Sequence, residues 1–166
     1  ILSLSEIETR KKDTNMQYES IQEILHYVEG LLRTQAEEKG LQLIVECEEI
    51  PLYFCNKDKI SQMFINLIEN AIKYTEKGSV TVHCKYQGEY FVLQVKDTGI
   101  GIPEESIERI FERFYRVDKS RSRKAGGTGL GLSIVKHIMM LYNGKVKVES
   151  KEGIGTIFTI TMPYKI

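Results

Sequence analysis

Cysteine, proline and long apolar stretches are all scarce in this sequence of 166 residues. The cysteines, Cys47, Cys55 and Cys84, are odd in number and form no CxxC pair. That pattern argues against a disulfide framework or a zinc site and favours a reducing cytoplasm. No apolar run approaches the roughly 18 residues that a membrane span needs, and no signal peptide is recognisable. With 3 prolines and 42% apolar residues, the composition is globular rather than disordered or collagen-like.

An excess of one charge is also missing, because 23 basic residues balance 23 acidic ones. A cationic surface along the whole chain, as many nucleic-acid and membrane binders have, is therefore not expected, although this balance still allows a local basic patch. The length fits one domain, since domains cluster at ~100–200 residues.

The first residues predict the end of a longer helix. The chain starts at Ile1 rather than Met, and residues 1–14 combine Leu4 and Ile7 with a charged stretch. A helix end with so little to pack against is typical of a coiled coil or bundle, and a frayed arm is the alternative. We expect a fragment of a longer protein, in which residues 1–15 are a helix end with its linker and residues 16–166 form one domain.

Helices and strands follow one another along the rest of the chain. Helices are expected from Ser20 to about Lys39, from Asn56 to about Tyr74, and over 104–115 and 129–142. Strands are expected over 41–47, 79–86, 89–97, 145–150 and 155–163, with a short one at 51–54. Residues 116–127 have almost no apolar content and predict a loop. The hairpin signals favour a mixed or antiparallel sheet with helices on one face, a two-layer α+β sandwich.

Polar residues flank the apolar stripe of the helix that follows Asn56. At about 100° per residue, Asn66, Asn70 and Lys73 fall along one edge of that stripe. Amide oxygens can ligate a hard cation, and a lysine is a point charge for phosphate. A solvated helix flank is the plainer interpretation of the same pattern. The apolar stripe itself consists of Ile60, Met63, Phe64, Leu67, Ile68, Ala71 and Ile72.

An acid and two glycines follow the strand 89–97, in the segment DTGIGI. Asp97 could accept a hydrogen bond from an exocyclic amine, while Gly99 and Gly101 would let a flat ring approach the backbone. A tight turn explains the same residues as well. A dinucleotide-binding fingerprint is rejected, because Glu104 occupies the position of its third glycine.

A second glycine segment, GGTGLGL at 126–132, opens an apolar helix. Backbone N–H groups at such a place can cradle phosphate, although the segment is not a P-loop. A basic cluster precedes it, and this cluster could be a solvated loop, a nucleic-acid patch or a lid over a polyanion. The glycine segment favours the lid. The cluster comprises Arg113, Arg116, Lys119, Arg121, Arg123 and Lys124.

Four motifs in order resemble the boxes of the histidine kinase catalytic and ATP-binding domain. They are NLIENAIKYT (66–75), DTGIGI (97–102), IFERFYR (110–116) and GGTGLGLSIVK (126–136), and GIGTIFTITMP (153–163) is similar to the closing hairpin of that family. The resemblance implies the Bergerat fold, a two-layer α/β sandwich with about five strands under three helices. Residues 1–15 would then be the end of a dimerisation and histidine-phosphotransfer helix.

The resemblance also implies roles for particular residues. Asp97 would accept from the adenine amine, with Gly99 and Gly101 beside the base. Asn70 would ligate Mg²⁺ and contact phosphates, with Asn66 supporting or sharing that role. Phosphate contacts would come from Lys73, Arg113 and Arg116, and Tyr74 would line the nucleotide site. Backbone donors around the triphosphate would come from Gly127, Thr128, Gly129, Leu130 and Gly131.

The chemistry implied is transfer of the γ-phosphate of ATP to a histidine outside this chain. His26, His83 and His137 lie in no His-Glu-type motif, so the chain is not expected to phosphorylate itself. A water-hydrolysing relative would have a glutamate where Asn66 stands, which disfavours rapid hydrolysis. A regulatory nucleotide-binding module without kinase activity stays open. Expected partners are ATP, the dimerisation domain of the same protein and a response regulator, without nucleic acid. We expect a cytoplasmic domain of a homodimeric protein in the bacterial cell membrane.

Overall fold

The computed structural model describes residues 15–113, 115 and 131–165. In chain order its elements are β1 (Gln17–Glu19), α2 (Ile21–Glu38), β2 (Gln42–Cys47), β3 (Tyr53–Cys55), α3 (Lys57–Lys73), β4 (Ser79–Gln87), β5 (Tyr90–Asp97), the 3₁₀ helix η1 (Glu104–Arg109), α5 (Gly131–Leu141), β6 (Lys145–Lys151) and β7 (Gly155–Pro163).

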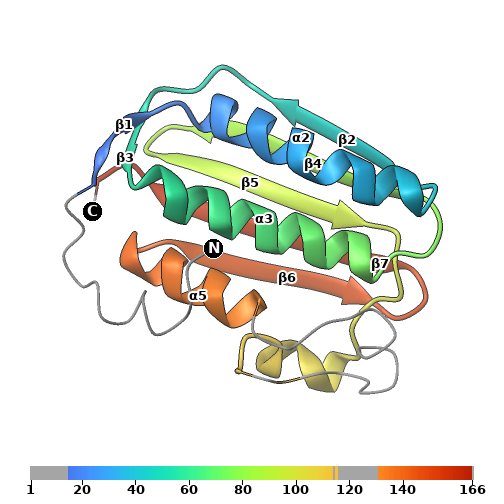
Figure 1. The fold of residues 1–166 in the computed structure, drawn as a ribbon. Coiled ribbons are helices and arrows are strands. Elements are labelled where there is room, and N and C mark those ends of the chain that lie inside the picture. Colours follow the sequence, from blue (N-terminus) through green and yellow to red (C-terminus); the bar gives the residue numbers. More distant parts are fainter. Residues whose placement is uncertain (1–14, 114, 116–130, 166) are drawn as a thin grey trace.

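The main sheet has five strands in the order β2-β4-β5-β7-β6. β2 runs parallel to β4, and every other neighbouring pair is antiparallel. Helices α2, α3 and α5 lie side by side over one face of this sheet (Figure 1). The predicted two-layer α+β sandwich with a mixed, mostly antiparallel sheet is therefore confirmed.

The central helix α3 packs its predicted apolar stripe onto the sheet. Ile60, Met63, Phe64 and Ile68 are fully buried. Asn56 caps the helix, because its Oδ1 accepts from the backbone N–H groups of Asp58 and Lys59 at 2.9 and 3.2 Å. The cap satisfies two of the donors that a helix N-terminus leaves unpaired. This packing fixes which flank of α3 stays accessible for polar side chains.

The other helices also begin and end at recognisable signals. The Ser20 hydroxyl accepts from the Glu23 N–H at 3.2 Å at the start of α2. Gly40 and Asn143 follow the ends of α2 and α5 with φ of 71° and 55°, the left-handed backbone that often terminates helices. Among the helices of the described part, none has both the length and the apolar character needed to cross a membrane.

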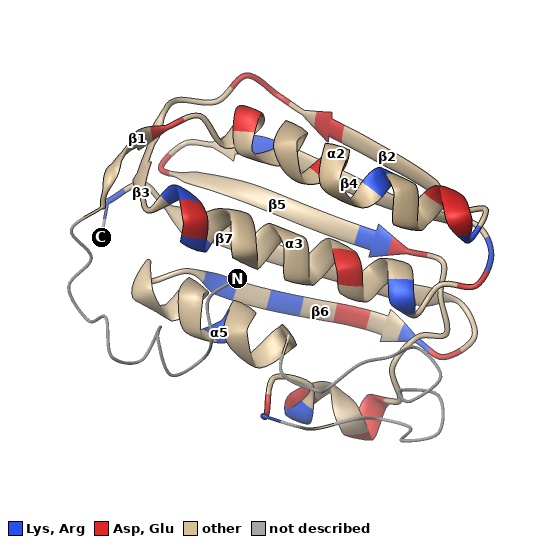
Figure 2. Ribbon diagram, viewed as in Figure 1, with Lys and Arg blue, Asp and Glu red and all other residues tan. Residues whose placement is uncertain are grey.

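The opposite face of the sheet carries no helix of the described part (Figure 1). Most side chains that β4, β5 and β6 turn to this face are polar. Lys145, Lys147 and Glu149 point to this side from β6, where charged residues mark the strand in Figure 2. A shallow hollow of about 210 Å³ lies on it, lined by His83, Lys85, Gln87, Val92, Gln94, Thr159 and Thr161. Asp97 is buried on the helix side of β5, so this hollow is separate from the predicted site.

Two predictions about elements need correction. The helix expected over 104–115 is only the six-residue 3₁₀ helix η1, followed by turns. Bonds from Glu112 N–H to Arg109 C=O and from Tyr115 N–H to Glu112 C=O, both three residues apart, continue that tighter winding. The strand β1 was not predicted, because its three residues carry no periodic signal. It pairs with β3 in a separate two-stranded sheet.

Candidate functional site

The carboxylate of Asp97 is held at the end of β5 by two backbone donors. Its Oδ1 accepts from the N–H of Gly99 at 2.9 Å and from the N–H of Thr156 at 3.2 Å. The residue is 7% exposed, and burial raises the pKa of its carboxyl above the usual value, against the lowering effect of both hydrogen bonds. No described residue donates to Oδ2, and no described buried side-chain oxygen lacks a partner, so Oδ2 reaches the surface. One oxygen is fixed, and the other can accept from a ligand.

The loop after Asp97 is fastened to α3 on one side and to the β6–β7 turn on the other. The Ile100 N–H donates to the carbonyl of Tyr74 at 3.1 Å, and the Ile100 carbonyl accepts from Gly153 at 2.8 Å. A Cβ on Gly99 would lie 2.2 Å from the Tyr74 carbonyl oxygen. On Gly101, which has φ of +74°, it would lie 2.2 Å from the carbonyl oxygen of Lys151. Protein backbone therefore already requires both glycines, whatever a ligand adds.

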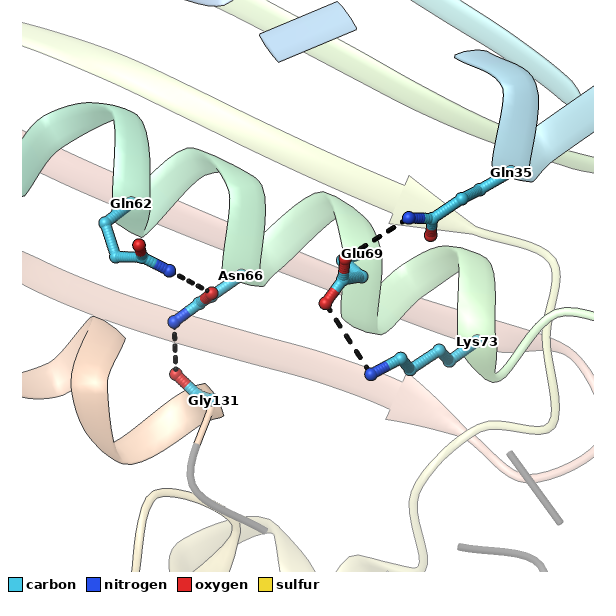
Figure 3. Close-up of polar contacts among 6 residues, drawn as sticks. All are labelled: Gln35, Gln62, Asn66, Glu69, Lys73 and Gly131. Atoms are coloured by element: carbon cyan, nitrogen blue, oxygen red, sulfur yellow. Dashed lines mark hydrogen bonds and ion pairs between the residues drawn. The ribbon is translucent and has the colours of Figure 1, made fainter. Parts of the chain in front are cut away.

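The first amide of the α3 flank joins two predicted motifs (Figure 3). The Oδ1 of Asn66 accepts from Gln62 Nε2 at 2.7 Å, and its Nδ2 donates to the carbonyl of Gly131 at 3.3 Å. Gly131 is the first residue of α5, so the bond ties α3 to the end of the second glycine segment. Asn66 thus holds Gly131 at the start of α5, and its oxygen is already shared with Gln62.

The second amide and the following tyrosine lie one turn further along α3. Asn70 is half-buried, and among the described residues its side chain forms no hydrogen bond. The backbone carbonyl of Asn70 accepts from the backbone N–H of Tyr74, the residue that ends the helix. Since Tyr74 also contacts the loop after Asp97, the flank of α3 and that loop meet at this end of the helix. The structure therefore brings the first two motifs together.

Lys73 ends the flank and lies beside an acid of the same helix. Its Nζ is 3.6 Å from Glu69 Oε1, and Glu69 Oε2 accepts from Gln35 of α2 at 3.4 Å (Figure 3). The Lys73 and Glu69 side chains are 34% and 31% exposed, so solvent screens this ion pair and makes it weak. Lys73 can therefore exchange Glu69 for an anionic ligand at little cost.

Beyond η1, side chains fold back onto the protein. Arg109 pairs with Glu112 at 2.8 Å and lies 4.5 Å from the ring centre of Tyr115, whose hydroxyl donates to Ser106 at 2.9 Å. The ring of Phe111 meets Phe158 edge to face at 6.2 Å. Phe111 thus packs against the hydrophobic core through β7.

Several predicted site residues remain predictions. Arg113 is exposed in a turn after η1, and it has an interaction of its own. Gly131 is described as the first residue of α5. The others lie outside the described residues, namely Arg116, Gly127, Thr128, Gly129 and Leu130.

Three residues of the site were missed from sequence. Thr156 fixes Asp97 from β7, its register partner on the neighbouring strand. Thr75 is fully buried, its hydroxyl bonds the Ala71 carbonyl at 2.8 Å, and it lies against Gly99. Gln62 orients Asn66. Thr75 and Thr156 both lie in motifs recognised from the sequence, NLIENAIKYT and GIGTIF. Their roles depend on contacts between distant segments, such as the register of β5 and β7.

The donor set favours a cation that arrives with its own ligands. In the described part of the chain, no group of three or more His, Cys, Asp or Glu side chains could hold a metal ion. Mg²⁺ commonly takes one or two protein oxygens and completes its shell with water and phosphate oxygens. The free amide of Asn70 fits that requirement, whereas zinc or calcium would need more protein ligands.

Comparisons with known proteins agree with this arrangement. The family model for "Histidine kinase-, DNA gyrase B-, and HSP90-like ATPase" matches residues 55–166. Sensor histidine kinase WalK of Bacillus subtilis strain 168 is 36% identical over 169 residues, covering 99% of this chain and 28% of that protein. Sensor histidine kinase YclK of the same strain is 38% identical over 142 residues, covering 85% of this chain and 30% of that protein.

Solved structures share the fold closely. Full-length ShkA in complex with AMPPNP superposes with a TM-score of 0.84 at 26% identity, covering 97% of this chain and 34% of that one. The nucleotide-free catalytic domain of histidine kinase ThkA gives 0.78 at 27% identity, with 90% and 96% covered.

The chain therefore belongs to the histidine kinase-, DNA gyrase B- and HSP90-like ATPase family, within which it is a sensor histidine kinase catalytic domain of two-component signalling. It spans 28% and 30% of the length of the two kinases from Bacillus subtilis.

Proposed function

We propose that the chain binds Mg²⁺-ATP between the flank of α3 and the loop after Asp97, and presents the γ-phosphate to a histidine of a dimerisation domain. The phosphoryl group would then pass to an aspartate of a response regulator. The observation that carries the proposal is Asp97, a buried carboxylate with one oxygen fixed by backbone and the other available.

Asp97 suits the adenine end of the nucleotide. Burial raises the pKa of the Asp97 carboxyl, and the two backbone donors oppose that effect because they stabilise the charged form. An ionised Oδ2 would accept from the exocyclic amine of adenine, and a bond to a charged acceptor is worth about 1.5–3 kcal/mol. Gly99 and Gly101 let the loop beside this carboxylate pack closely against the backbone of Tyr74 and Lys151.

The α3 flank suits the phosphate end. Asn70 would supply an amide oxygen to Mg²⁺, Asn66 would hold the start of α5 in place, and Lys73 would offer a positive charge. When bound, Mg²⁺ neutralises charge on the phosphates, which is a main need of phosphoryl transfer. Arg113, Arg116 and the backbone of the second glycine segment are proposed for the rest of the triphosphate. Tyr74 would line the site at the end of α3.

The arrangement supports transfer to a protein over hydrolysis by water. A hydrolase of this family would need a general base on α3, and Asn66 cannot accept a proton there. Glu69, the next acid along the helix, is engaged by Lys73 and Gln35. A hydrolase would show steady ATP turnover by the purified chain, and we expect very little.

We do not propose any of the three histidines of this chain as the acceptor of the phosphoryl group. His26 is exposed on α2, with 87% of its side chain accessible. His83 lines the hollow on the open face of the sheet, away from Asp97. His137 lies in α5 with contacts of its own. The acceptor is therefore proposed on a dimerisation domain, in a membrane-anchored homodimer, and the chain alone should not phosphorylate itself.

Calorimetric titration of the chain with ATP, with and without Mg²⁺, tests this function. We expect saturable binding that Mg²⁺ strengthens. In Asn70→Ala, the increase in ATP affinity caused by Mg²⁺ should be at least about tenfold smaller. The matched control is Gln94→Ala, which removes an amide on the other face of the sheet.

Two results would contradict the proposal. One is the absence of saturable binding to any adenosine phosphate. The other is an Asn70→Ala variant that keeps the full effect of Mg²⁺, which would refute the ligand assignment while leaving the Asp97 contact to be judged separately.

A further inference from the structure

Two cysteines lie opposite each other at one end of the sheet. Cys47 ends the edge strand β2, and its register partner on the parallel strand β4 is Cys84. Neighbouring strands are ~4.8 Å apart, within the ~4.4–6.8 Å that Cα atoms of a disulfide span. Cys84 is fully buried in the core, and Cys47 is partly buried against the same core. The two side chains therefore share the helix side of the sheet, and one of them is accessible.

The two thiols contact each other and differ in acidity. The hydrogen bond from Cys84 lowers the pKa of Cys47, although burial and Glu48 act in the opposite direction. The same bond, together with burial, raises the pKa of Cys84. The Cys47 thiol itself donates to the Glu48 carbonyl at 3.3 Å. Because Cys84 is buried and Cys47 is partly exposed, and because the thiolate is the reactive form, Cys47 is the thiol of the pair that an oxidant attacks first.

The third cysteine provides an internal comparison. Cys55 is fully buried in β3, where it pairs with Gln17 in the separate two-stranded sheet. Burial raises its pKa to about 12, so it stays a protonated, unreactive thiol. Metal binding does not account for the Cys47–Cys84 contact, because no cluster of metal-ligating side chains is present in the described part of the chain.

We propose that Cys47 and Cys84 form an oxidisable thiol pair, which a hydroperoxide converts to an intramolecular disulfide. The Cys47 thiolate attacks one peroxide oxygen, the O–O bond breaks, and the other oxygen leaves as water or an alcohol after taking a proton. Cys47 is then a sulfenic acid. The Cys84 sulfur attacks that sulfur, the S–O bond breaks, and the hydroxyl leaves as water with the Cys84 proton. Two thiols are oxidised, and one peroxide is reduced.

The position of the pair determines what the disulfide would change. Asp97 pairs with Val80 at the start of β4, whereas Cys84 lies further along that strand and pairs with Leu93. The cross-link therefore leaves the carboxylate site uncovered. It closes a loop from Cys47 to Cys84 that contains all of α3, which restricts the unfolded chain. Oxidation should raise the Tm by several degrees and leave affinity for ADP unchanged.

Peptide mapping after peroxide treatment tests the proposal in the 166-residue chain. The reduced protein is treated with hydrogen peroxide, free thiols are blocked with N-ethylmaleimide, and the digest is analysed by mass spectrometry without reductant. We expect one cross-linked peptide pair joining Cys47 to Cys84, which dithiothreitol separates, while Cys55 carries the maleimide only after denaturation. Cys47→Ser and Cys84→Ala should each abolish the pair, and Cys55→Ala should not.

Other outcomes overturn it. Cys47 recovered as a free thiol would show that the peroxide does not oxidise it. Cys47 recovered as a sulfinic acid or in a disulfide between two chains would show that Cys84 does not resolve it. A link that includes Cys55 would show that the register contact does not decide the pairing. As a measurement without variants, maleimide should label Cys47 before the other cysteines in the native reduced protein, and equal labelling rates would contradict the difference in reactivity.

Discussion

The two ends of α3 lie on the same sheet but use their polar atoms in opposite ways. At the N-terminal end, aromatic side chains surround Tyr53, whose ring meets those of Phe91 and Tyr164 at 4.9 and 5.1 Å. The Tyr53 hydroxyl donates to the Pro163 carbonyl at 2.9 Å, and the Tyr142 hydroxyl accepts from the Asn56 N–H at 2.9 Å. Every one of these hydroxyls is committed to a bond within the protein.

At the C-terminal end of α3, the backbone does most of the holding. Backbone N–H groups fix Asp97 Oδ1, and a backbone bond joins Ile100 to Tyr74. Side-chain atoms such as Asp97 Oδ2 and the amide of Asn70 form no hydrogen bond with the described residues. The difference suggests that one end provides stability and the other provides binding, which substitutions can separate.

Tyr53→Ala should give the largest loss of stability. Tyr53 is 1% exposed, and truncating a buried aromatic side chain costs about 3–5 kcal/mol. At ~2–4 °C per kcal/mol, the Tm should fall by roughly 10 °C, as calorimetry or circular dichroism would measure. ADP affinity of the folded variant should stay the same. A large loss of affinity well below the Tm would contradict the division between the two ends.

Asp97→Asn should cause the largest loss of binding. Asparagine can keep the Oδ1 bonds, but it places an amide NH₂ group, which donates, where Oδ2 would accept. ATP affinity should therefore fall by about tenfold or more. Inorganic triphosphate should lose less. Glu149→Gln, on the open face of the sheet, is the control.

The same variant should be more stable than the parent chain at neutral pH. Burial raises the pKa of Asp97, so its contribution to stability is full below the ordinary aspartate pKa and is lost as pH rises through the raised value. Asparagine cannot ionise, so its contribution to stability does not fall as pH rises. Urea unfolding at several pH values would measure this, and a destabilised variant at neutral pH would contradict the role assigned to burial.

Gly101→Ala should have an intermediate effect on both properties. Its φ of +74° disfavours alanine, and the added Cβ would meet the Lys151 carbonyl oxygen at 2.2 Å. We expect a loss of about 1–3 kcal/mol in unfolding free energy, with weaker ADP binding because the loop shifts. Gly88→Ala is the matched control, since its φ is +62° but nothing lies within 4 Å. Equal losses of unfolding free energy in the two variants would show that the contact with the Lys151 carbonyl has no role.

Glu69→Gln should have the smallest effect. The exposed Glu69–Lys73 pair contributes only ~0.3–0.5 kcal/mol to stability. Releasing Lys73 and removing a negative charge should tighten triphosphate binding slightly, by less than about threefold, and more at low salt. Titration at two ionic strengths would measure it, with Glu149→Gln as the control. Weaker binding would argue against Lys73 as a phosphate contact.

Sequence patterns predicted what depends on local periodicity. The stripe on α3, the cap at Asn56 and the hairpin of β4 and β5 were all visible in the sequence, because each signal lies within a few neighbouring residues. The helix predicted over 104–115 was too long, because acidic residues after Pro103 suit the start of an α-helix and that of a 3₁₀ helix equally well. The three-residue β1 is too short to show a pattern.

The site was predictable as a set of motifs but not as a set of contacts. Asp97 was identified, yet its bond to Thr156 depends on the register of β5 and β7. The bond between Asn66 and Gly131 depends on how α5 packs beside α3, which no local pattern encodes. The same holds for the Cys47–Cys84 contact, which arises only because β2 and β4 are parallel neighbours.

Comparing ADP with inosine diphosphate in one calorimetric titration tests the role of Asp97 most directly. The two ligands differ at the base, where the exocyclic amine of adenine is replaced by an oxygen that cannot donate to a carboxylate. The account predicts saturable ADP binding and at least about tenfold weaker binding of inosine diphosphate. Equal affinities for the two would contradict it.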